Sequence, residues 1–459
     1  MKSNMLVKRL IHTLFFTFVS ISSTQVMSQE INVKDKSEQV DKLFECMVNA
    51  AVPGASIIVI NQGKILHKKG YGLANIEQNK PNTPETIFRI GSMTKQFTAM
   101  AILQLYDKGM LQINDYVEKY MPGTMNGNKV TIKHLLTHTS GILESLDSEL
   151  VFTPGDQISY SNAGYYLLGK IIEKVSGISY ENYLQKNIFK PLGMDNTGYE
   201  HPNSRSRNSA LGYKISDNDN YINVSEPDIS GAYAAGALYS TAEDMYRWDQ
   251  VLYTEKLIKT STLNQAFSQM TLNDGSKAKY GFGWMVNQWR GLKEVGHGGD
   301  ITGFNSYIAR FPEEQFTVIV LSNVEMRPPG PLPNAGDLAH KIAEIYLSDK
   351  ISTAKEEQHV VILLNSRILE NYLGQYKWVN VSKGWIETGG EFFTIIKKNN
   401  QLFLQTKTAE IEIFAETETR FFMKDNSTIR FVKENDKVTG LVFDAMDLGV
   451  VIVKAQKIN

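Results

Sequence analysis

The chain has 459 residues, of which 42% are hydrophobic, 21% charged and 10% aromatic. This balance is typical of a soluble globular protein and excludes a disordered chain, a collagen and a multi-span membrane protein. With 48 basic and 49 acidic side chains the formal net charge is −1, so no strong field favours binding to nucleic acid. The single cysteine, Cys46, excludes an internal disulfide and a cysteine-based metal cage.

The first 28 residues predict a secretory signal peptide. The basic residues Lys2, Lys8 and Arg9 precede a short apolar stretch, and small residues stand just before Gln29. The stretch is too short and too broken by Thr and Ser for a stable membrane span. We therefore expect cleavage near Ser28/Gln29 and an exported protein, either periplasmic or secreted. An uncleaved N-terminal anchor is the alternative.

The next elements alternate between helix and strand. Apolar residues at helical spacing predict an amphipathic helix that begins near Ser37. Ala55–Ile60 and Lys64–Lys69 are predicted as two strands joined by a tight turn. After a short strand at Ile87–Ile90 comes a helix, Met93 to Tyr106, that is apolar nearly all round. A helix without a polar face is expected to be buried.

The middle of the chain is predicted as helices, a polar insertion and a hairpin. Ser240 and Glu243 look like a capping box that begins a helix toward Trp248. The other predicted elements are helices at Lys170–Val175 and Tyr180–Phe189, a surface insertion at Glu200–Gly231, an antiparallel hairpin at Phe304–Phe311 and Phe316–Ser322, an exposed loop at Pro328–Pro333 and a closing helix at Leu338–Tyr346.

The character of the chain changes near residue 350. Short alternating strands and polar turns then predict a separate antiparallel sandwich or small barrel. The predicted strands are Phe392–Lys397, Gln401–Gln405, Ile411–Ala415, Arg420–Met423, Thr428–Val432, Leu441–Asp444 and Val450–Lys454. The chain is therefore expected to divide into residues 1–28, 29–350 and 351–459.

Three short motifs carry candidate chemistry. Ser92 and Lys95 lie one turn apart at the start of the buried helix, where a lysine with a lowered pKa can help to deprotonate a serine. Tyr160 and Asn162 stand in a loop before a helix, where a phenol can exchange protons and an amide can hold a carbonyl. His297 precedes two glycines, Gly298 and Gly299, that allow a substrate to lie along bare backbone. Each motif alone is equally well explained as ordinary structure.

Taken in this order, the three motifs resemble those of the superfamily of serine β-lactamases, penicillin-binding proteins and D-alanyl-D-alanine carboxypeptidases. The similar branch is that of class C β-lactamases and related esterases and D-aminopeptidases. Further segments that resemble this branch are Leu135–Gly141, Ala235–Thr241 and Tyr280–Trp284. The segment Tyr372–Tyr376 looks like the beginning of the β-barrel, described as lipocalin-like, that is often appended to such hydrolases.

The resemblance implies an α+β fold: an antiparallel sheet of N- and C-terminal strands, helices on both faces, an inserted helical lobe and a C-terminal antiparallel β-barrel. It implies an acyl-enzyme on Ser92, with Lys95 and Tyr160 as the proton relay and Tyr160 favoured as the general base. The oxyanion hole would be the backbone N–H groups of Ser92 and Asp300. Asn162 and His297-Gly298-Gly299 would bind the substrate.

One departure from the family pattern affects the predicted substrate. The usual third motif is Lys-(Ser/Thr)-Gly, which binds a carboxylate through a cation and a hydroxyl. Here His297 is only partly charged near neutral pH and Gly298 has no hydroxyl. We therefore expect an esterase, D-amino-acid amidase or peptidase acting on a small molecule or peptide. A carboxypeptidase, an antibiotic-degrading β-lactamase and a non-catalytic penicillin-binding or peptidoglycan scaffold are the alternatives.

No cofactor is expected. His134 and His138 have the spacing of a helical metal pair but lack the glutamate of His-Glu-x-x-His, so zinc is disfavoured. We expect instead a buried junction between helix and loop, with His138 hydrogen-bonded inside the fold. The sequence does not indicate an oligomeric state.

Overall fold

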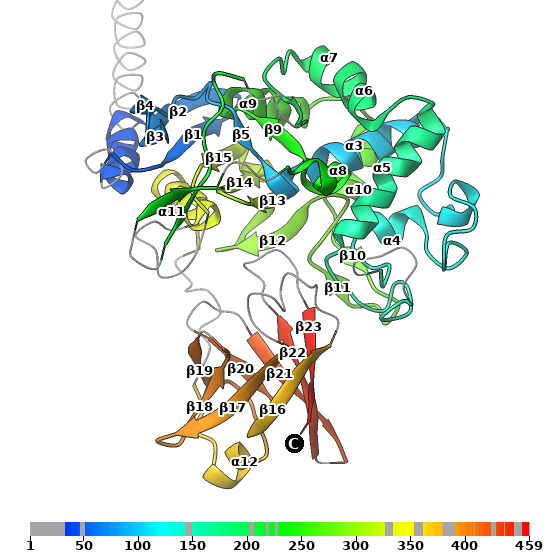
Figure 1. The fold of residues 1–459 in the computed structure, drawn as a ribbon, viewed down its shortest axis with the longest axis vertical. Helices are drawn as coiled ribbons and strands as arrows, with labels where there is room; N and C mark the ends of the chain where they lie inside the picture. The colour runs from blue at the N-terminus through cyan, green and yellow to red at the C-terminus, as the bar shows by residue number, and fades with distance from the viewer. Residues whose placement is uncertain are drawn as a thin grey trace, which may run out of the picture.

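The structure is a computed structural model, shown in Figure 1. It describes residues 33–45, 51–142, 149–201, 206–216, 220–224, 228–325, 334–352, 361–379, 391–407, 409–423, 428–435, 437–444 and 452–458. The predicted signal peptide and the predicted loop at Pro328–Pro333 lie outside these residues. The predicted N-terminal helix is present and spans residues 33–43.

A six-stranded antiparallel sheet in the order β12-β13-β14-β15-β1-β2 forms the centre of the larger domain. Strand β1 pairs with β2 on one side and with β15 on the other, so the sheet joins the beginning of the domain to its end. This topology confirms the expected fold class. The strands are β1 (Ala55–Asn61), β2 (Lys64–Tyr71), β12 (Met285–Trp289), β13 (Leu292–Ile301), β14 (Phe304–Phe311) and β15 (Phe316–Ser322).

Helices cover both faces of this sheet because β1 is apolar on both sides. Ile58 and Ile60 belong to the core shared with α9 (Ala242–Val251), whereas Ile57 and Val59 belong to the core shared with α11 (Ala335–Leu347). Successive side chains of a strand point to opposite faces, so a strand buried on both faces is a continuous apolar run.

The inserted part of the domain is mainly helical and gathers on one side of the sheet in Figure 1. Its central helix, α3 (Thr94–Asp107), is buried on all sides from Thr94 to Leu105, as expected. Helix α5 (Asn162–Ser176) begins eight residues earlier than predicted because Ser161 caps it by accepting from the Gly164 N–H at 3.0 Å. The other helices are α4 (Ile132–Leu136), α5 (Asn162–Ser176), α6 (Tyr180–Leu184), a π-helical turn (Gln185–Phe189), α7 (Lys190–Leu192), α8 (Tyr233–Gly236), α10 (Thr260–Ala266) and 3-10 turns at Gly91–Met93, Val117–Lys119, Ser230–Ala232 and Pro312–Glu314.

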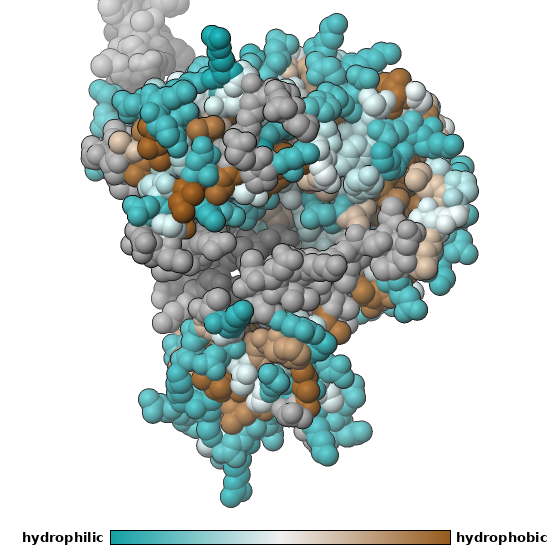
Figure 2. All heavy atoms as spheres, in the orientation of Figure 1, coloured by the Kyte–Doolittle hydropathy of each residue, from teal (hydrophilic) through white to brown (hydrophobic). Residues whose placement is uncertain are grey.

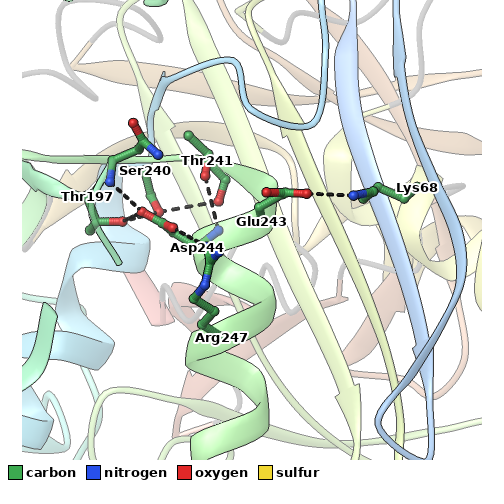
Figure 3. A network of polar contacts seen from close by, with 8 residues as sticks. Lys68, Thr197, Ser240, Thr241, Glu243, Asp244 and Arg247 are labelled. Atoms are coloured by element: carbon green, nitrogen blue, oxygen red, sulfur yellow. Dashed lines mark hydrogen bonds and ion pairs between the residues drawn. The ribbon is translucent and has the colours of Figure 1, made fainter. Parts of the chain in front are cut away.

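The cap of α9 differs from the predicted capping box by one residue. Thr241, not Ser240, accepts from the backbone N–H of Asp244 at 3.0 Å, as Figure 3 shows. Glu243 is then free to turn outward and pair with Lys68 of β2 at 2.6 Å. Both serine and threonine are good caps, and only the backbone angle at Thr241 decides between them.

The polar stretch Glu200–Gly231 is not wholly a surface insertion. Tyr213 is buried, and its N–H lies within hydrogen-bond distance of the carbonyls of Gly303 and Asn323. The segment therefore reaches the end of the central sheet. Within this segment β7 (Tyr213–Ile215) pairs with β8 (Tyr221–Asn223). The other small sheets of the larger domain are β3 (Leu73–Asn75) with β4 (Lys80–Pro81), β5 (Phe88–Arg89) with β9 (Leu238–Ser240) and β6 (Gly198–Tyr199), and β10 (Met270–Thr271) with β11 (Lys277–Ala278).

A buried ion pair links α9 to the sheet and supports a first prediction. Arg310 Nε donates to Asp249 Oδ1 at 2.6 Å, and both side chains are at most 1% exposed. Removing one partner leaves a buried charge, so Asp249→Ala is expected to lower the free energy of unfolding by about 3–5 kcal/mol. Urea unfolding followed by tryptophan fluorescence measures this loss. Glu314→Ala, which breaks a partly exposed pair with Lys350, is the control and should cost less than about 1 kcal/mol.

The C-terminal strands close into an eight-stranded antiparallel barrel in the order β16 to β23. Closure occurs because β16 pairs with β23, which decides for a barrel against a sandwich. Its interior is filled by aromatic residues such as Tyr372, Tyr376 and Phe431. The strands are β16 (Gly374–Val379), β17 (Phe392–Lys398), β18 (Gln401–Gln405), β19 (Glu410–Ala415), β20 (Arg420–Phe422), β21 (Thr428–Glu434), β22 (Lys437–Asp444) and β23 (Ile452–Lys457), with α12 (Ser366–Glu370) before them. The lipocalin-like assignment and the domain boundary near residue 350 stay predictions.

The face drawn in Figure 2 is mostly hydrophilic over the described residues, and its hydrophobic patches are small and scattered. Within the described ranges, none of the helices combines the length and apolar character needed to cross a membrane.

Candidate active site

The structure places Ser92 and Lys95 side by side at the seam where the Gly91–Met93 turn and the helical part of the domain pack against β13. Ser92 lies in the 3-10 turn Gly91–Met93, and Lys95 is in the first turn of α3. Their three-residue spacing puts both on one face of the helical segment. Lys95 Nζ lies 3.1 Å from Ser92 Oγ. The other complete Ser-x-x-Lys copy among the described residues, Ser276 to Lys279, is exposed around the β10–β11 hairpin.

The Lys95 amine is fully buried and has two further oxygen partners. Nζ lies 2.8 Å from Asn162 Oδ1 and 2.8 Å from the Ala235 carbonyl oxygen. Burial lowers the pKa of Lys95 well below its usual value. A neutral amine has two N–H groups and one lone pair. Those two N–H groups match the two oxygen partners, so the lone pair is left to face the Ser92 hydroxyl.

Tyr160 lies above this pair, held by the loop that precedes α5. Its ring centroid is 4.6 Å from Lys95 Nζ, and its hydroxyl has a hydrogen bond with Ser92. Burial raises the pKa of Tyr160, and the Ser92 hydrogen bond opposes the rise. The phenol therefore keeps its proton near neutral pH.

His138 supports the position of Tyr160. The two rings are in contact, with centroids 4.2 Å apart and planes tilted by 34°, and His138 Nδ1 accepts from the Ser161 N–H at 3.0 Å. Burial lowers the pKa of His138 well below its usual value, so the ring is neutral and acts as an acceptor. The sequence expectation of a hydrogen-bonded, buried His138 is confirmed. His134 lies elsewhere in the network, accepting at Nδ1 from the Thr131 N–H at the beginning of α4.

His297 is held as a neutral ring. Its Nδ1 lies 2.6 Å from the Gly298 carbonyl oxygen, so this nitrogen carries the proton and donates. Nε2 must then accept from the Tyr280 hydroxyl at 2.8 Å. Burial, followed by the charge of Lys95, lowers the pKa of His297 to about 3. His297 therefore supplies no positive charge for a substrate carboxylate in this arrangement.

The last part of β13 has an open edge toward Ser92. Strand β12 pairs with β13 only as far as Gly296, so residues 297–301 extend beyond it. A Cβ on Gly299 would lie 1.9 Å from the Ile90 carbonyl oxygen, and one on Gly91 would lie 3.0 Å from the Asp300 nitrogen. Glycine is needed at both positions for this close approach. The approach puts the backbones of Ser92 and Asp300 next to each other, as two oxyanion donors require.

The structure thus gathers all the predicted site residues around one seam. Asn162 is exposed at the beginning of α5, and its side-chain Oδ1 accepts a hydrogen bond from Lys95 Nζ. Sequence reasoning missed three supporting groups: the Ala235 carbonyl, Tyr280 and the contact of His138 with Tyr160. All three lie in segments that resembled the family, which was the available signal. Their roles and those of the predicted residues stay predictions.

The comparison with protein families decides the evolutionary assignment. The family model described as Beta-lactamase matches residues 40–341. The chain belongs to the beta-lactamase family. This superfamily of serine hydrolases includes penicillin-binding proteins and amidases, which confirms the family resemblance seen in the motifs.

Three similar proteins extend the comparison beyond the family domain. Penicillin-binding protein 4* of Bacillus subtilis is 28% identical over 85% of this chain and 92% of its own length. The octameric penicillin-binding protein homologue of Pyrococcus abyssi is 26% identical, with a TM-score of 0.63 over 92% of this chain and 99% of that one. A D-stereospecific amidohydrolase of Streptomyces sp. is 27% identical, with a TM-score of 0.53 over 63% of this chain and 94% of that one.

Proposed function

We propose that this protein hydrolyses amides or esters of small D-amino-acid or peptide substrates through an acyl-enzyme on Ser92. The observation that carries the proposal is the buried Lys95 amine, 3.1 Å from Ser92 Oγ with both of its other contacts to oxygens. Similarity to a D-stereospecific amidohydrolase supports the substrate class. We also propose export after removal of residues 1–28, on the sequence pattern alone.

The mechanism follows from the protonation states of the site. Ser92 Oγ attacks the substrate carbonyl carbon while its proton passes to the neutral Lys95 amine. The oxyanion that forms accepts hydrogen bonds from the backbone N–H groups of Ser92 and Asp300. The Tyr160 hydroxyl donates a proton to the leaving nitrogen or oxygen, and the C–N or C–O bond breaks. Water then attacks the Ser92 ester and gives its proton to the Tyr160 phenolate. The protonated Lys95 amine returns a proton to Ser92 Oγ as the C–O bond breaks, which releases the acid and restores the serine.

This assignment exchanges the predicted roles within the relay. The family resemblance favours Tyr160 as general base. Burial, however, lowers the pKa of Lys95 and raises that of Tyr160, which favours Lys95 as the base and Tyr160 as the acid.

Intact mass spectrometry with a fluorophosphonate and with benzylpenicillin tests the proposal. We expect a fluorophosphonate adduct that maps to Ser92, together with hydrolysis of D-amino-acid p-nitroanilides or nitrophenyl esters. A stable penicilloyl adduct on Ser92 would point instead to the penicillin-binding carboxypeptidase alternative. Rapid penicillin turnover would point to a β-lactamase. A protein with no adduct and no turnover of any substrate would leave only the non-catalytic scaffold.

The pH dependence of kcat/KM is a second prediction. Acylation needs neutral Lys95, so activity should rise with pH through a pKa that lies well below the usual value near 10.5. It needs protonated Tyr160, whose raised pKa moves the alkaline loss above the usual value of 10. We therefore expect a plateau across neutral pH. Hydrolysis of a D-amino-acid p-nitroanilide, whose leaving nitrogen must be protonated, measures the profile between pH 5 and pH 11, and activity that begins only near pH 10.5 would contradict it.

A further inference from the structure

Asp300 places an exposed carboxylate beside the predicted oxyanion hole. It is the second-last residue of β13, directly after Gly298-Gly299, and its own N–H is one of the two proposed oxyanion donors. A Cβ on Gly91 would lie 3.0 Å from the Asp300 nitrogen, which puts Asp300 next to the Ser92 turn. A substrate whose carbonyl oxygen receives this N–H must therefore pass close to the Asp300 side chain.

The strand geometry shows on which side the carboxylate lies. Gly299 faces the Ser92 turn, because its Cβ would meet the Ile90 carbonyl and the Met93 nitrogen. Successive residues of a strand point to opposite faces, so Asp300 shares the other face with Gly298. On that face the Tyr307 ring covers Gly298, since a Cβ on Gly298 would lie 3.3 Å from Tyr307 Cδ2, whereas Asp300, two residues further along, is exposed. The Asp300 carboxylate is therefore open to a substrate that lies along the free edge of β13.

A second carboxylate strengthens the negative charge at this end of the site. Glu325 follows β15, and its N–H donates to the Tyr213 carbonyl at 2.7 Å, which fixes its position. Although Asp300 is exposed as a residue, packing around its carboxylate removes part of the hydration; this loss, followed by the charge of Glu325, raises the pKa of Asp300 to about 6. Asp300 is thus mostly ionised at neutral pH. Over the described ranges of the chain, neither carboxylate has an ion-pair partner.

The charge on the neighbouring groups does not cancel this field. His297, three residues before Asp300 on the same strand, is neutral with a pKa of about 3. Lys95 is buried beneath Tyr160, and burial lowers its pKa. At neutral pH the described residues at this edge therefore present negative charge, where binding of a substrate carboxylate would require positive charge.

We propose that Asp300, supported by Glu325, selects substrates that carry an ammonium group beside the bond that is cleaved. The α-ammonium of an unblocked amino-acid amide or ester is the matching group. A substrate with a carboxylate at the same place is repelled. This specificity role rests on the proposed Ser92 hydrolase function and names the charge of its substrate.

Three p-nitroanilides of D-alanine that differ only in the group on the α-nitrogen test the proposed specificity role of Asp300. The free amine carries a positive charge, the N-acetyl derivative is neutral and the N-succinyl derivative is negative. The readout is the ratio of kcat/KM values for amine over N-acetyl, in which any general loss of catalysis cancels. We expect the wild-type order amine, N-acetyl, N-succinyl, and Asp300→Asn should lower the ratio about tenfold.

Further measurements separate a charge effect from a structural one. Glu325→Gln should lower the same ratio by a smaller factor. If Asp300→Asn does not fold, the ratio measured for Glu325→Gln tests the charge effect in its place. Raising the salt concentration to 1 M should reduce the wild-type ratio, because salt screens exposed charges. Asp349→Asn, at an exposed position two residues after the end of α11, is the matched control and should leave the ratio unchanged.

The outcomes distinguish this proposal from the proposed function. A ratio that stays the same in Asp300→Asn and Glu325→Gln, while Ser92-dependent hydrolysis continues, overturns the role of Asp300 alone. Equal wild-type kcat/KM values for all three substrates do the same. A wild-type protein that hydrolyses none of the three, and whose Ser92 is not labelled by a fluorophosphonate, overturns the proposed hydrolase and the specificity role together.

Discussion

Replacing Ser92 by alanine is expected to reduce kcat/KM at least about 10³-fold on every ester and amide substrate. The substitution removes the hydroxyl oxygen that lies 3.1 Å from Lys95 Nζ and next to the open edge of β13. Without it no acyl-enzyme forms, although the oxyanion donors and the substrate edge remain. The fold should be retained, because Ser92 is a half-buried small residue in a 3-10 turn.

Ser276 is the matched control for this experiment. It belongs to a second Ser-x-x-Lys sequence, with Lys279 three residues on, but it is exposed and its hydroxyl donates to Asp274 at 2.6 Å. Ser276→Ala should leave both turnover and fluorophosphonate labelling unchanged. Full turnover in Ser92→Ala with a normal melting temperature would exclude the acyl-enzyme mechanism. Loss of fluorophosphonate labelling in Ser276→Ala would show that Ser276, and not Ser92, is the nucleophile.

Replacing Lys95 by methionine should also lower acylation by at least about 10³-fold, because the side chain keeps its length but loses the base. Burial of an amine is costly, so the apolar methionine should not destabilise the fold. The rate of the fluorophosphonate reaction with Ser92 measures acylation directly. Lys279→Met, at the equivalent position of the exposed copy, is the control and should react at the wild-type rate.

Tyr160→Phe separates the acid from the base. If Tyr160 protonates the leaving group, its loss should matter far more for an anilide than for a nitrophenyl ester, whose leaving group needs no proton. If Lys95 is the base, Lys95→Met should lower kcat/KM by the same factor for the anilide and for the ester. Equal losses on both substrates in Tyr160→Phe, with only a small loss in Lys95→Met, would return the base role to Tyr160.

Many elements were predictable because their signals are local. The β14–β15 hairpin begins and ends at the predicted residues, since alternating apolar strands flank the polar turn at Pro312–Glu314. Helix α3 is buried all round, as its uninterrupted apolar composition predicts. The Ser92–Lys95 contact is local as well, because three residues of helical backbone are enough to bring the two side chains together.

Elements were misplaced where two local choices had similar energies. Ser240 and Thr241 are both good caps, and Tyr213 lies in a polar stretch that gives no sign of burial. The closing pair of β16 and β23 joins strands some 75 residues apart, so strand patterns alone left a barrel and a sandwich equally open.

By itself the sequence determined the residue types of the site, the spacing of Ser92 and Lys95 and the alternation of strands and helices. Only the tertiary structure decided their protonation. Packing removes water from Lys95 and His297 and so lowers the pKa of both groups, and this desolvation depends on neighbours far away in the chain. Tyr160 reaches Ser92 across 68 residues for the same reason: the His138 ring that holds it belongs to another element.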